Sequence, residues 1–313
     1  MTSKASNKKV IITDGVERFN RVKPVTNVFF TALFILLAFI CVVPAIFVLI
    51  LSLSSEASIQ AIGYSFIPQE WSLETYSYLL KNINMISRSL FNSVFITIVG
   101  TLVGLVLCST MGYTLSRPNF KLKKFLTFFI FIPMLFSGGM VANYMVITAL
   151  YGLRNTYAAL ILPIACSTFY IIIMRTFFQT TVPDSVIESA KIDGARQIRI
   201  FTQIVLPISL PAIATIGLFF TFGYWNDWFL AKMYLNTNRQ DLYPLQYVLI
   251  SIERNIEFMT RNMQFMSADA RVNIPSETIR MAIVVIVVLP IACSYPFFQK
   301  YFISGLTIGA VKG

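Results

Sequence analysis

Six long stretches of the sequence contain no Asp, Glu, Lys or Arg. They cover residues 24–55, 89–116, 125–153, 155–174, 200–226 and 281–299, so that each is at least 19 residues long. About 20 apolar residues span a bilayer core as a helix, and lipid offers backbone polar groups no partner outside that helix. We therefore predict an all-α polytopic membrane protein with six transmembrane helices, at about 28–52, 90–115, 125–147, 156–174, 205–228 and 280–302.

The composition agrees with a chain that is embedded in lipid. Charged residues make up 12% of the 313 residues and hydrophobic residues 56%, whereas about 25% of a soluble domain is charged. The chain has no histidine, which excludes imidazole-bound metals and His-based catalytic triads. The four cysteines lie far apart and form no CxxC spacing typical of a zinc site; they are Cys41, Cys108, Cys166 and Cys293. We therefore expect no catalytic residue and no metal site.

The net charge of +11 is concentrated in one set of segments. The N-terminus, 116–124, 175–204 and the C-terminus hold 16 Lys and Arg with five acidic residues, whereas the opposite set holds nine basic and nine acidic residues. Because cytoplasmic loops carry an excess of Lys and Arg, we predict that both termini lie in the cytoplasm, with 1–26 as a cytoplasmic tail. Membrane orientation accounts for the charge, so no nucleic-acid partner is needed.

The second predicted helix carries a small residue at every fourth position. Residues four apart lie on the same face of a helix, and small side chains let helices approach closely in lipid. The face consists of Gly100, Gly104, Cys108 and Gly112. We predict that it packs against another helix.

The segment between the fourth and fifth predicted helices is patterned like a pair of short helices. Ser185 and Glu188 have the spacing of a capping box, and Gly194 is the residue type that most often ends a helix. We therefore predict a first helix over about 186–193. One face of a second helix is predicted from i, i+3, i+4, i+7 spacing, and it consists of Ile198, Phe201, Thr202 and Val205. Such a pair should protrude and offer an amphipathic surface to a partner.

A motif runs through this same segment. Glu188-Ser189-Ala190 is followed after three residues by Gly194, and after nine more by Ile204-x-Leu206-Pro207. The motif resembles the EAA signature of ABC importer permeases, EAAx3Gx9IxLP. Every fixed spacing matches, and Ser189 replaces the first alanine.

Two further elements resemble the carbohydrate-uptake family of these permeases. Trp225-Asn226-Asp227 is similar to its WN[DE] element, and the ending YPFFQKYFISGLTIGAVKG (295–313) is similar to that of the oligosaccharide branch with LplC- and YtcP-type permeases. The six predicted spans and cytoplasmic termini agree with the MalG-type half. The resemblance implies a type I ABC importer fold over 27–313, with its core at about 90–305 and a coupling loop at 183–207.

The resemblance also implies a division of labour in a bacterial cytoplasmic membrane. The chain would be a multi-pass permease rather than an enzyme, and it would need a second homologous permease. Two ATPase subunits would use ATP and Mg²⁺, and an extracellular sugar-binding (lipo)protein would deliver an oligosaccharide. The chain has no GxxxxGK[ST] motif, and no cofactor is implied for it. ATPase coupling would fall to Glu188, Ser189, Ala190, Gly194, Ala195, Ile204, Leu206 and Pro207.

The fifth predicted helix ends in several aromatic residues and an amide. Aromatic rings stack on sugars and amides hydrogen-bond to hydroxyl groups, so these residues suit a substrate pathway. The candidates are Phe220, Tyr224, Trp225 and Asn226. An aromatic belt at the membrane interface explains the same composition, and the sequence leaves both interpretations open.

Other functions fit the sequence less well. A stand-alone secondary transporter usually has inverted repeats and ionisable residues in the middle of its spans, and neither is found in this sequence. An intramembrane enzyme needs a catalytic constellation, which is hard to assemble without His or an HExxH motif. Within the permease class, another small polar solute is the alternative to an oligosaccharide.

Overall fold

The computed structural model of the chain describes residues 24–81, 83–262 and 276–310. Residues 1–23 of the predicted tail 1–26 lie outside the described residues, and so do residues 311–313. In chain order, the helical segments are α2 (Pro24–Ser52), α3 (Glu56–Ile62), α4 (Glu74–Leu80), α5 (Ile83–Ser116), α6 (Lys123–Leu135), α7 (Gly139–Met145), η1 (Val146–Leu150), α8 (Tyr157–Ala165), α9 (Thr168–Thr181), α10 (Asp184–Ile192), α11 (Gln197–Ile200), η2 (Phe201–Val205), α12 (Leu206–Ile208), α13 (Leu210–Asn226), α14 (Phe229–Tyr234), η3 (Thr237–Leu242), α15 (Leu245–Arg261) and α16 (Ser276–Ala310).

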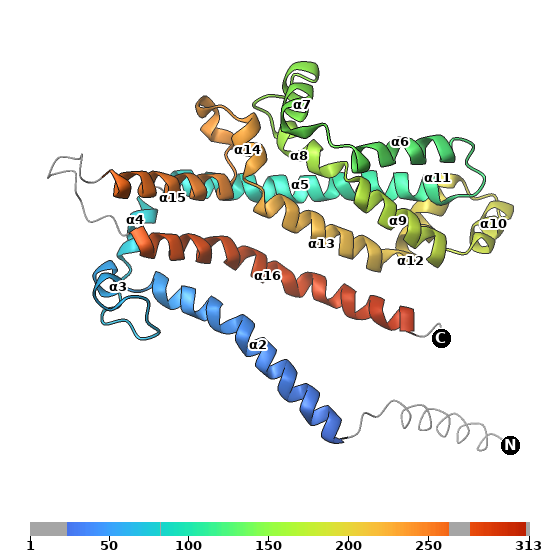
Figure 1. Ribbon diagram of the computed structural model, residues 1–313. Coiled ribbons are helices and arrows are strands. Elements are labelled where there is room, and N and C mark those ends of the chain that lie inside the picture. The colour runs from blue at the N-terminus through green and yellow to red at the C-terminus, as the bar shows by residue number, and fades with distance from the viewer. Residues whose placement is uncertain (1–23, 82, 263–275, 311–313) are drawn as a thin grey trace.

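The long helix α5 is the centre of the molecule and packs against α8, α9, α13 and α15 (Figure 1). Its small residues allow this packing. A Cβ atom at Gly100 would lie 2.5 Å from the ring of Tyr224, and one at Gly104 would lie 2.7 Å from the ring of Phe220. Because α13 carries both rings, the predicted small-residue face is confirmed as a helix-packing surface.

Several predicted spans are long helices, and two are broken. The first, second and sixth predicted helices lie within α2, α5 and α16. The third is interrupted between α6 and α7, where Gly139 has a φ of 78°. The fourth bends by 46° between α8 and α9. In both cases the predicted stretch holds two helices with a break between them. Pro133 and Pro163, which lack a backbone N–H, lie in the last turn before each break and weaken the helix there.

Among the described residues, α2 and α5 are each long and apolar enough to cross a membrane. Two bent pairs also qualify if each is counted as one span: α8 with α9, and Gln197–Ile208 with α13, which meet at 81°. Helix α2 contacts α16, but none of its most apolar 18 residues is buried. So large an exposed apolar surface suits lipid or another subunit.

The segment between α13 and α16 is a helical cap over the ends of the long helices. Leu245 and Leu249 of α15 are buried beside Ile86 of α5 and Ile279 of α16. The amide of Asn92 in α5 donates to the carbonyl oxygens of Asp241 and Tyr243, at 2.8 Å and 3.1 Å. Within the described residues, this segment is therefore folded onto the helices instead of standing away from them.

The two ends of the molecule differ in what they carry (Figure 1). Helices α10 and α11 lie at one end, together with the ends of α5 and α9. Helices α3 and α4 and the outer part of α15 lie at the opposite end. Figure 1 also shows that α2 begins, and α16 ends, toward the end that carries α10.

Candidate coupling loop

The first helix of the candidate loop is α10, and it begins earlier than the sequence predicts. Pro183 is its N-cap, with φ −63° and ψ 138°, and no side chain caps the helix. The predicted capping box of Ser185 and Glu188 is therefore wrong, because Ser185 already lies inside the helix. Pro183 fixes a backbone conformation that suits the residue before a helix, and Asp184 places a carboxylate in the first turn, where the helix dipole favours it.

Gly194 ends α10 in the left-handed conformation, as predicted. Its φ is 79°. Its N–H donates to the carbonyl of Lys191 at 3.0 Å, and the N–H of Ala195 donates to that of Ala190 at 2.9 Å. These two bonds form a Schellman motif, which requires a residue that tolerates positive φ. The first half of the loop is thus a short helix with a fixed end.

Helix α10 has a buried face and an exposed face. Ile187 and Ala190 are buried against the body of the protein, whereas Glu188 and Ser189 are exposed. Ile192 is 86% exposed, although it is as apolar as the core residues. The motif residues therefore have two roles in this geometry: Ala190 attaches the helix, and Glu188 and Ser189 lie on the face that a partner can reach.

The second half of the loop also packs on the body, and only part of the predicted face takes part. Ile200 and Val205 are fully buried, whereas Ile198 is 78% exposed and Thr202 is exposed. The four residues predicted to line one face are therefore divided: Phe201 and Val205 pack on the body, and Ile198 and Thr202 are exposed. The π-helical turn η2, with i→i+5 bonds, shifts the phase of the face from that of an α-helix. Ala195, Phe201 and Ile204 complete the packing.

The fifth long helix begins later than predicted. The α-helix α13 starts at Leu210. Residues 205–208 belong to the end of η2 and to α12, which contains Leu206 and Pro207 of the motif. Ser209 separates the two with φ −98° and ψ 10°. Pro211 in the first turn of α13 has no N–H to continue the helix from upstream. The motif's end therefore forms the 81° corner between the loop and α13.

A groove of about 370 Å³ separates α10 from the end of α5. Its walls combine aromatic, aliphatic and charged side chains, among them Tyr113, Arg117, Phe120, Ile187, Glu188 and Lys191. An ion pair closes one side, because the Nη1 atom of Arg117 lies 2.9 Å from the Oδ1 atom of Asp184. In the sequence, Arg117 counts only toward the basic charge of 116–124. Its position directly after a predicted span was the one feature of the sequence that could have marked Arg117 as a candidate functional residue.

Comparison with known proteins identifies the family of the chain that carries this loop. Residues 100–308 match the family described as the inner membrane component of binding-protein-dependent transport systems. The match covers more than half of the chain and includes the whole EAA-like motif. The chain belongs to this permease family. It is therefore a permease subunit of an ABC importer, a class of subunit that is not itself the ATPase.

Two relatives of this permease are similar to it over most of their length. It is 41% identical over 279 residues to the polygalacturonan/rhamnogalacturonan transport system permease protein YtcP of Bacillus subtilis (strain 168), covering 89% of this chain and 95% of the relative. It is 39% identical over 274 residues to protein LplC of the same strain, covering 88% and 90%. These relatives confirm the resemblance drawn from the motif and the chain's ending.

A solved structure confirms the importer permease fold. The chain resembles a bacterial ABC transporter involved in the import of the acidic polysaccharide alginate, with a TM-score of 0.75 and 27% identity. The likeness covers 90% of this permease and 99% of the solved chain. The fold of α2 to α16 is thus that of an ABC importer permease.

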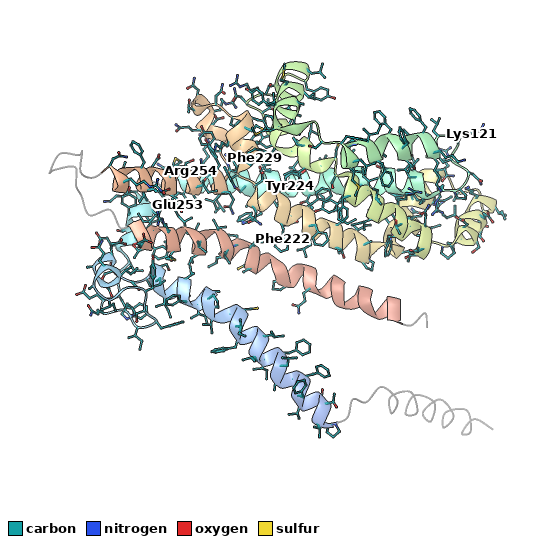
Figure 2. The ribbon with its side chains drawn as sticks, viewed as in Figure 1. Lys121, Phe222, Tyr224, Phe229, Glu253 and Arg254 are labelled. Atoms are coloured by element: carbon teal, nitrogen blue, oxygen red, sulfur yellow. The ribbon has the colours of Figure 1, made fainter. Side chains whose placement is uncertain are left out.

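Three of the four candidate pathway residues are packed inside this permease. Phe220, Tyr224 and Trp225 are buried. The Tyr224 hydroxyl donates to the carbonyl of Ile161 at 2.8 Å, and the Trp225 Nε1–H donates to that of Val287 at 3.1 Å. Figure 2 shows Tyr224 on the side of α13 toward α5 and α8, and Phe222 on the side toward α16.

Asn226 is the exposed member of that set. Its Nδ2 atom donates to the carbonyl of Phe222 at 3.0 Å, which holds the amide at the end of α13. The structure therefore places Phe220 and Tyr224 in one buried cluster and Trp225 in another, and it leaves the amide at the surface. Within the described ranges, no group of three Cys, Asp or Glu side chains is placed to hold a metal ion.

Proposed function

We propose that this permease forms one half of the pore of an ATP-driven importer that carries an oligosaccharide into a bacterial cell. A second, homologous permease completes the pore, and an extracellular sugar-binding lipoprotein delivers the substrate. Two ATPase subunits bind the cytoplasmic face and use ATP and Mg²⁺. The observation that carries the proposal is α10, a helix with a fixed end that presents Glu188, Ser189 and the exposed Ile192.

The coupling loop at 183–207 is proposed to dock on an ATPase subunit. The exposed Ile192 supports this role, because burial of an exposed aliphatic side chain by a partner contributes about 1.5–3 kcal/mol. Ala190, Ala195 and Ile204 attach the loop to the body, and the corner at Leu206 and Pro207 connects it to α13. A displacement of α10 is thereby passed to the core of the permease.

The substrate is proposed to be an oligosaccharide that carries acidic sugars. Its support is that YtcP is named for polygalacturonan/rhamnogalacturonan and that the solved transporter imports the acidic polysaccharide alginate. Asn226, at the surface of the α13 end, is proposed to contact the sugar. Phe220, Tyr224 and Trp225 are proposed to position that end. Another small polar solute is the alternative substrate within the same class.

Six spans are proposed, with both termini in the cytoplasm: α2, α5, α6 with α7, α8 with α9, α13, and α16. The excess of Lys and Arg in the N-terminus, 116–124, 175–204 and the C-terminus supports this orientation, because such an excess faces the cytoplasm. Residues 1–26 are then a cytoplasmic tail and 27–313 the transmembrane domain, with its core at about 90–305.

Thiol labelling tests this orientation. In a variant without the four native cysteines, a single cysteine at Glu70→Cys should react with an impermeant maleimide in intact cells, because residue 70 lies outside. Lys121→Cys should react only after the cells are opened. Both native side chains are exposed in the permease, so burial cannot explain a difference. Labelling at position 121 in intact cells would reverse the proposed orientation.

ATP hydrolysis tests the proposed division of labour. The purified permease alone should hydrolyse no ATP above a blank, since it has no P-loop motif. When it is co-expressed with its partner permease and ATPase, the purified complex should hydrolyse ATP, and the sugar-loaded binding protein should stimulate that rate. Hydrolysis by the permease alone, or a complex indifferent to the loaded binding protein, would contradict the proposal.

A further inference from the structure

Arg117 follows the last residue of α5 and joins three elements of the cytoplasmic end. Its Nε–H donates to the Ser116 hydroxyl at 2.9 Å, and its Nη2–H donates to the Phe178 carbonyl of α9 at 3.2 Å. Its Nη1–H donates to the carboxylate of Asp184 at 2.9 Å. The guanidinium also lies over the ring of Tyr113, with 5.2 Å between its carbon and the ring centroid. One side chain thus contacts α5, α9 and the first turn of α10.

The burial of Arg117 separates this ion pair from an ordinary surface pair. Its side chain is 15% exposed, whereas that of Asp184 is 59% exposed. Exposed pairs contribute little because water screens them and both side chains lose freedom. Here the guanidinium is already held by Ser116, Phe178 and Tyr113, so little freedom remains to be lost when it binds Asp184. The planar fork of arginine makes several such bonds at once, which lysine cannot do.

Apolar contacts attach α10 independently of Arg117. Ile187 and Ala190 are buried in the same core as Phe178 and Ile200. Removal of the guanidinium therefore leaves α10 folded and attached, but with its first turn no longer fixed to the end of α5. Apolar contacts therefore attach α10 to the body, whereas polar contacts fix the position of its first turn.

We propose that Arg117 is a positioning residue that transmits movement between the coupling helix α10 and the pore helix α5. This inference rests on the proposed docking of α10 on an ATPase subunit. A push on the exposed face of α10 reaches Asp184, then Arg117 and the end of α5. Helix α5 in turn is fitted to α13 at Gly100 and Gly104, under the rings of Tyr224 and Phe220. The contact is therefore a polar link between the ATPase side and the packed core of the pore, beside the hydrogen bond that the Tyr113 hydroxyl donates to Gln197 at 3.4 Å.

The test uses the whole complex in proteoliposomes with a sugar-loaded binding protein. The measured quantity is the ratio of ATP hydrolysis with and without that protein. Arg117→Ala should lower the stimulation at least tenfold while the ATPase subunits still co-purify. Lys121→Ala is the matched control, because Lys121 is an exposed cation of the same connection between α5 and α6 (Figure 2) and should behave as wild type.

A double-mutant cycle separates transmission from general damage. If Arg117 acts through Asp184, the double variant Arg117→Ala/Asp184→Ala should be no worse than Arg117→Ala alone, because interacting residues are non-additive. Additive losses would overturn the inference. Arg117→Lys keeps a charge near Asp184 but loses the fork, and we expect intermediate stimulation. If Arg117→Ala fails to accumulate, Arg117→Lys and Asp184→Ala decide, and wild-type stimulation in both overturns the inference.

The outcomes also distinguish this inference from the proposed function. An unstimulated wild-type complex would contradict the proposed function itself. A stimulated wild-type complex with equal stimulation in Arg117→Ala would overturn only the role of Arg117. Loss of the ATPase subunits from the Arg117→Ala complex would also overturn it, since the residue would then hold the docking surface together and transmit nothing.

Discussion

Replacement of Gly194 by Asp should abolish ATP-driven sugar uptake while the complex still reaches the membrane. Gly194 has a φ of 79°, and a Cβ atom there would meet nothing within 4 Å inside the permease. The substitution therefore causes no internal clash, and the backbone strain is limited to about 1 kcal/mol. What changes is the outer surface of the coupling loop, and in the proposed docking the added carboxylate would have to be buried against the ATPase without a partner. Burial of an unpaired charge is prohibitive.

The measurement is uptake of labelled oligosaccharide at equal membrane abundance, with two controls. Gly152→Asp adds the same carboxylate at a positive-φ glycine, with φ 63° and open space, away from the loop, and should transport normally. Ser189→Ala restores the alanine of the EAA-like motif and should also transport close to normally. Normal uptake by Gly194→Asp would show that the loop has no docking role. A defect confined to Ser189→Ala would mean that the motif is misaligned.

The Gly112→Ala variant should be less stable than the wild-type protein. A Cβ atom at position 112 would lie 2.8 Å from the Cβ of Met174 and 3.0 Å from the backbone nitrogen of Arg175. These atoms belong to the core of α9 and cannot rotate away, so α5 and α9 must separate. Overpacking of this kind costs about 1–3 kcal/mol, which exceeds the gain of up to about 1 kcal/mol from replacing glycine in a helix.

Thermal unfolding of the purified complex in detergent checks this prediction. The midpoint should fall by several degrees, at about 2–4 °C per kcal/mol for a domain of 150–250 residues. Gly223→Ala is the matched control, because the nearest atom to its Cβ would be Ile164 Cγ2 at 3.9 Å. That variant should be neutral or slightly more stable. Equal midpoints for the two variants would contradict the close approach of α5 and α9.

The sequence predicts the long helices and their packing because lipid imposes simple rules. Charge-free length locates α2, α5 and α16, and the fourfold spacing from Gly100 to Gly112 locates the face that receives Phe220 and Tyr224. The left-handed conformation of Gly194 was predictable for a similar reason, since a glycine that follows a short amphipathic helix commonly ends it in that conformation. In each case a local property of the chain determines the structure.

Features that depend on tertiary packing were not predictable from the same patterns. The π-helical turn after Ile200 changes which residues of the loop are buried, and no α-helical spacing reveals it. Ser185 and Glu188 fit a capping box, but Pro183 and Asp184 start the helix first. The contact of Arg117 with Asp184 joins residues 67 positions apart, and a cation in a basic segment gives no indication of such a partner.

Uptake into proteoliposomes tests the central claim most directly. The complex of this permease, its partner permease and the ATPase is reconstituted, with labelled acidic oligosaccharide and binding protein outside. The account predicts uptake when the ATPase faces ATP and Mg²⁺, and no uptake when ATP is replaced by a non-hydrolysable analogue, with or without a proton or sodium gradient. Gradient-driven uptake by this permease alone, without ATP or partner subunits, would contradict it.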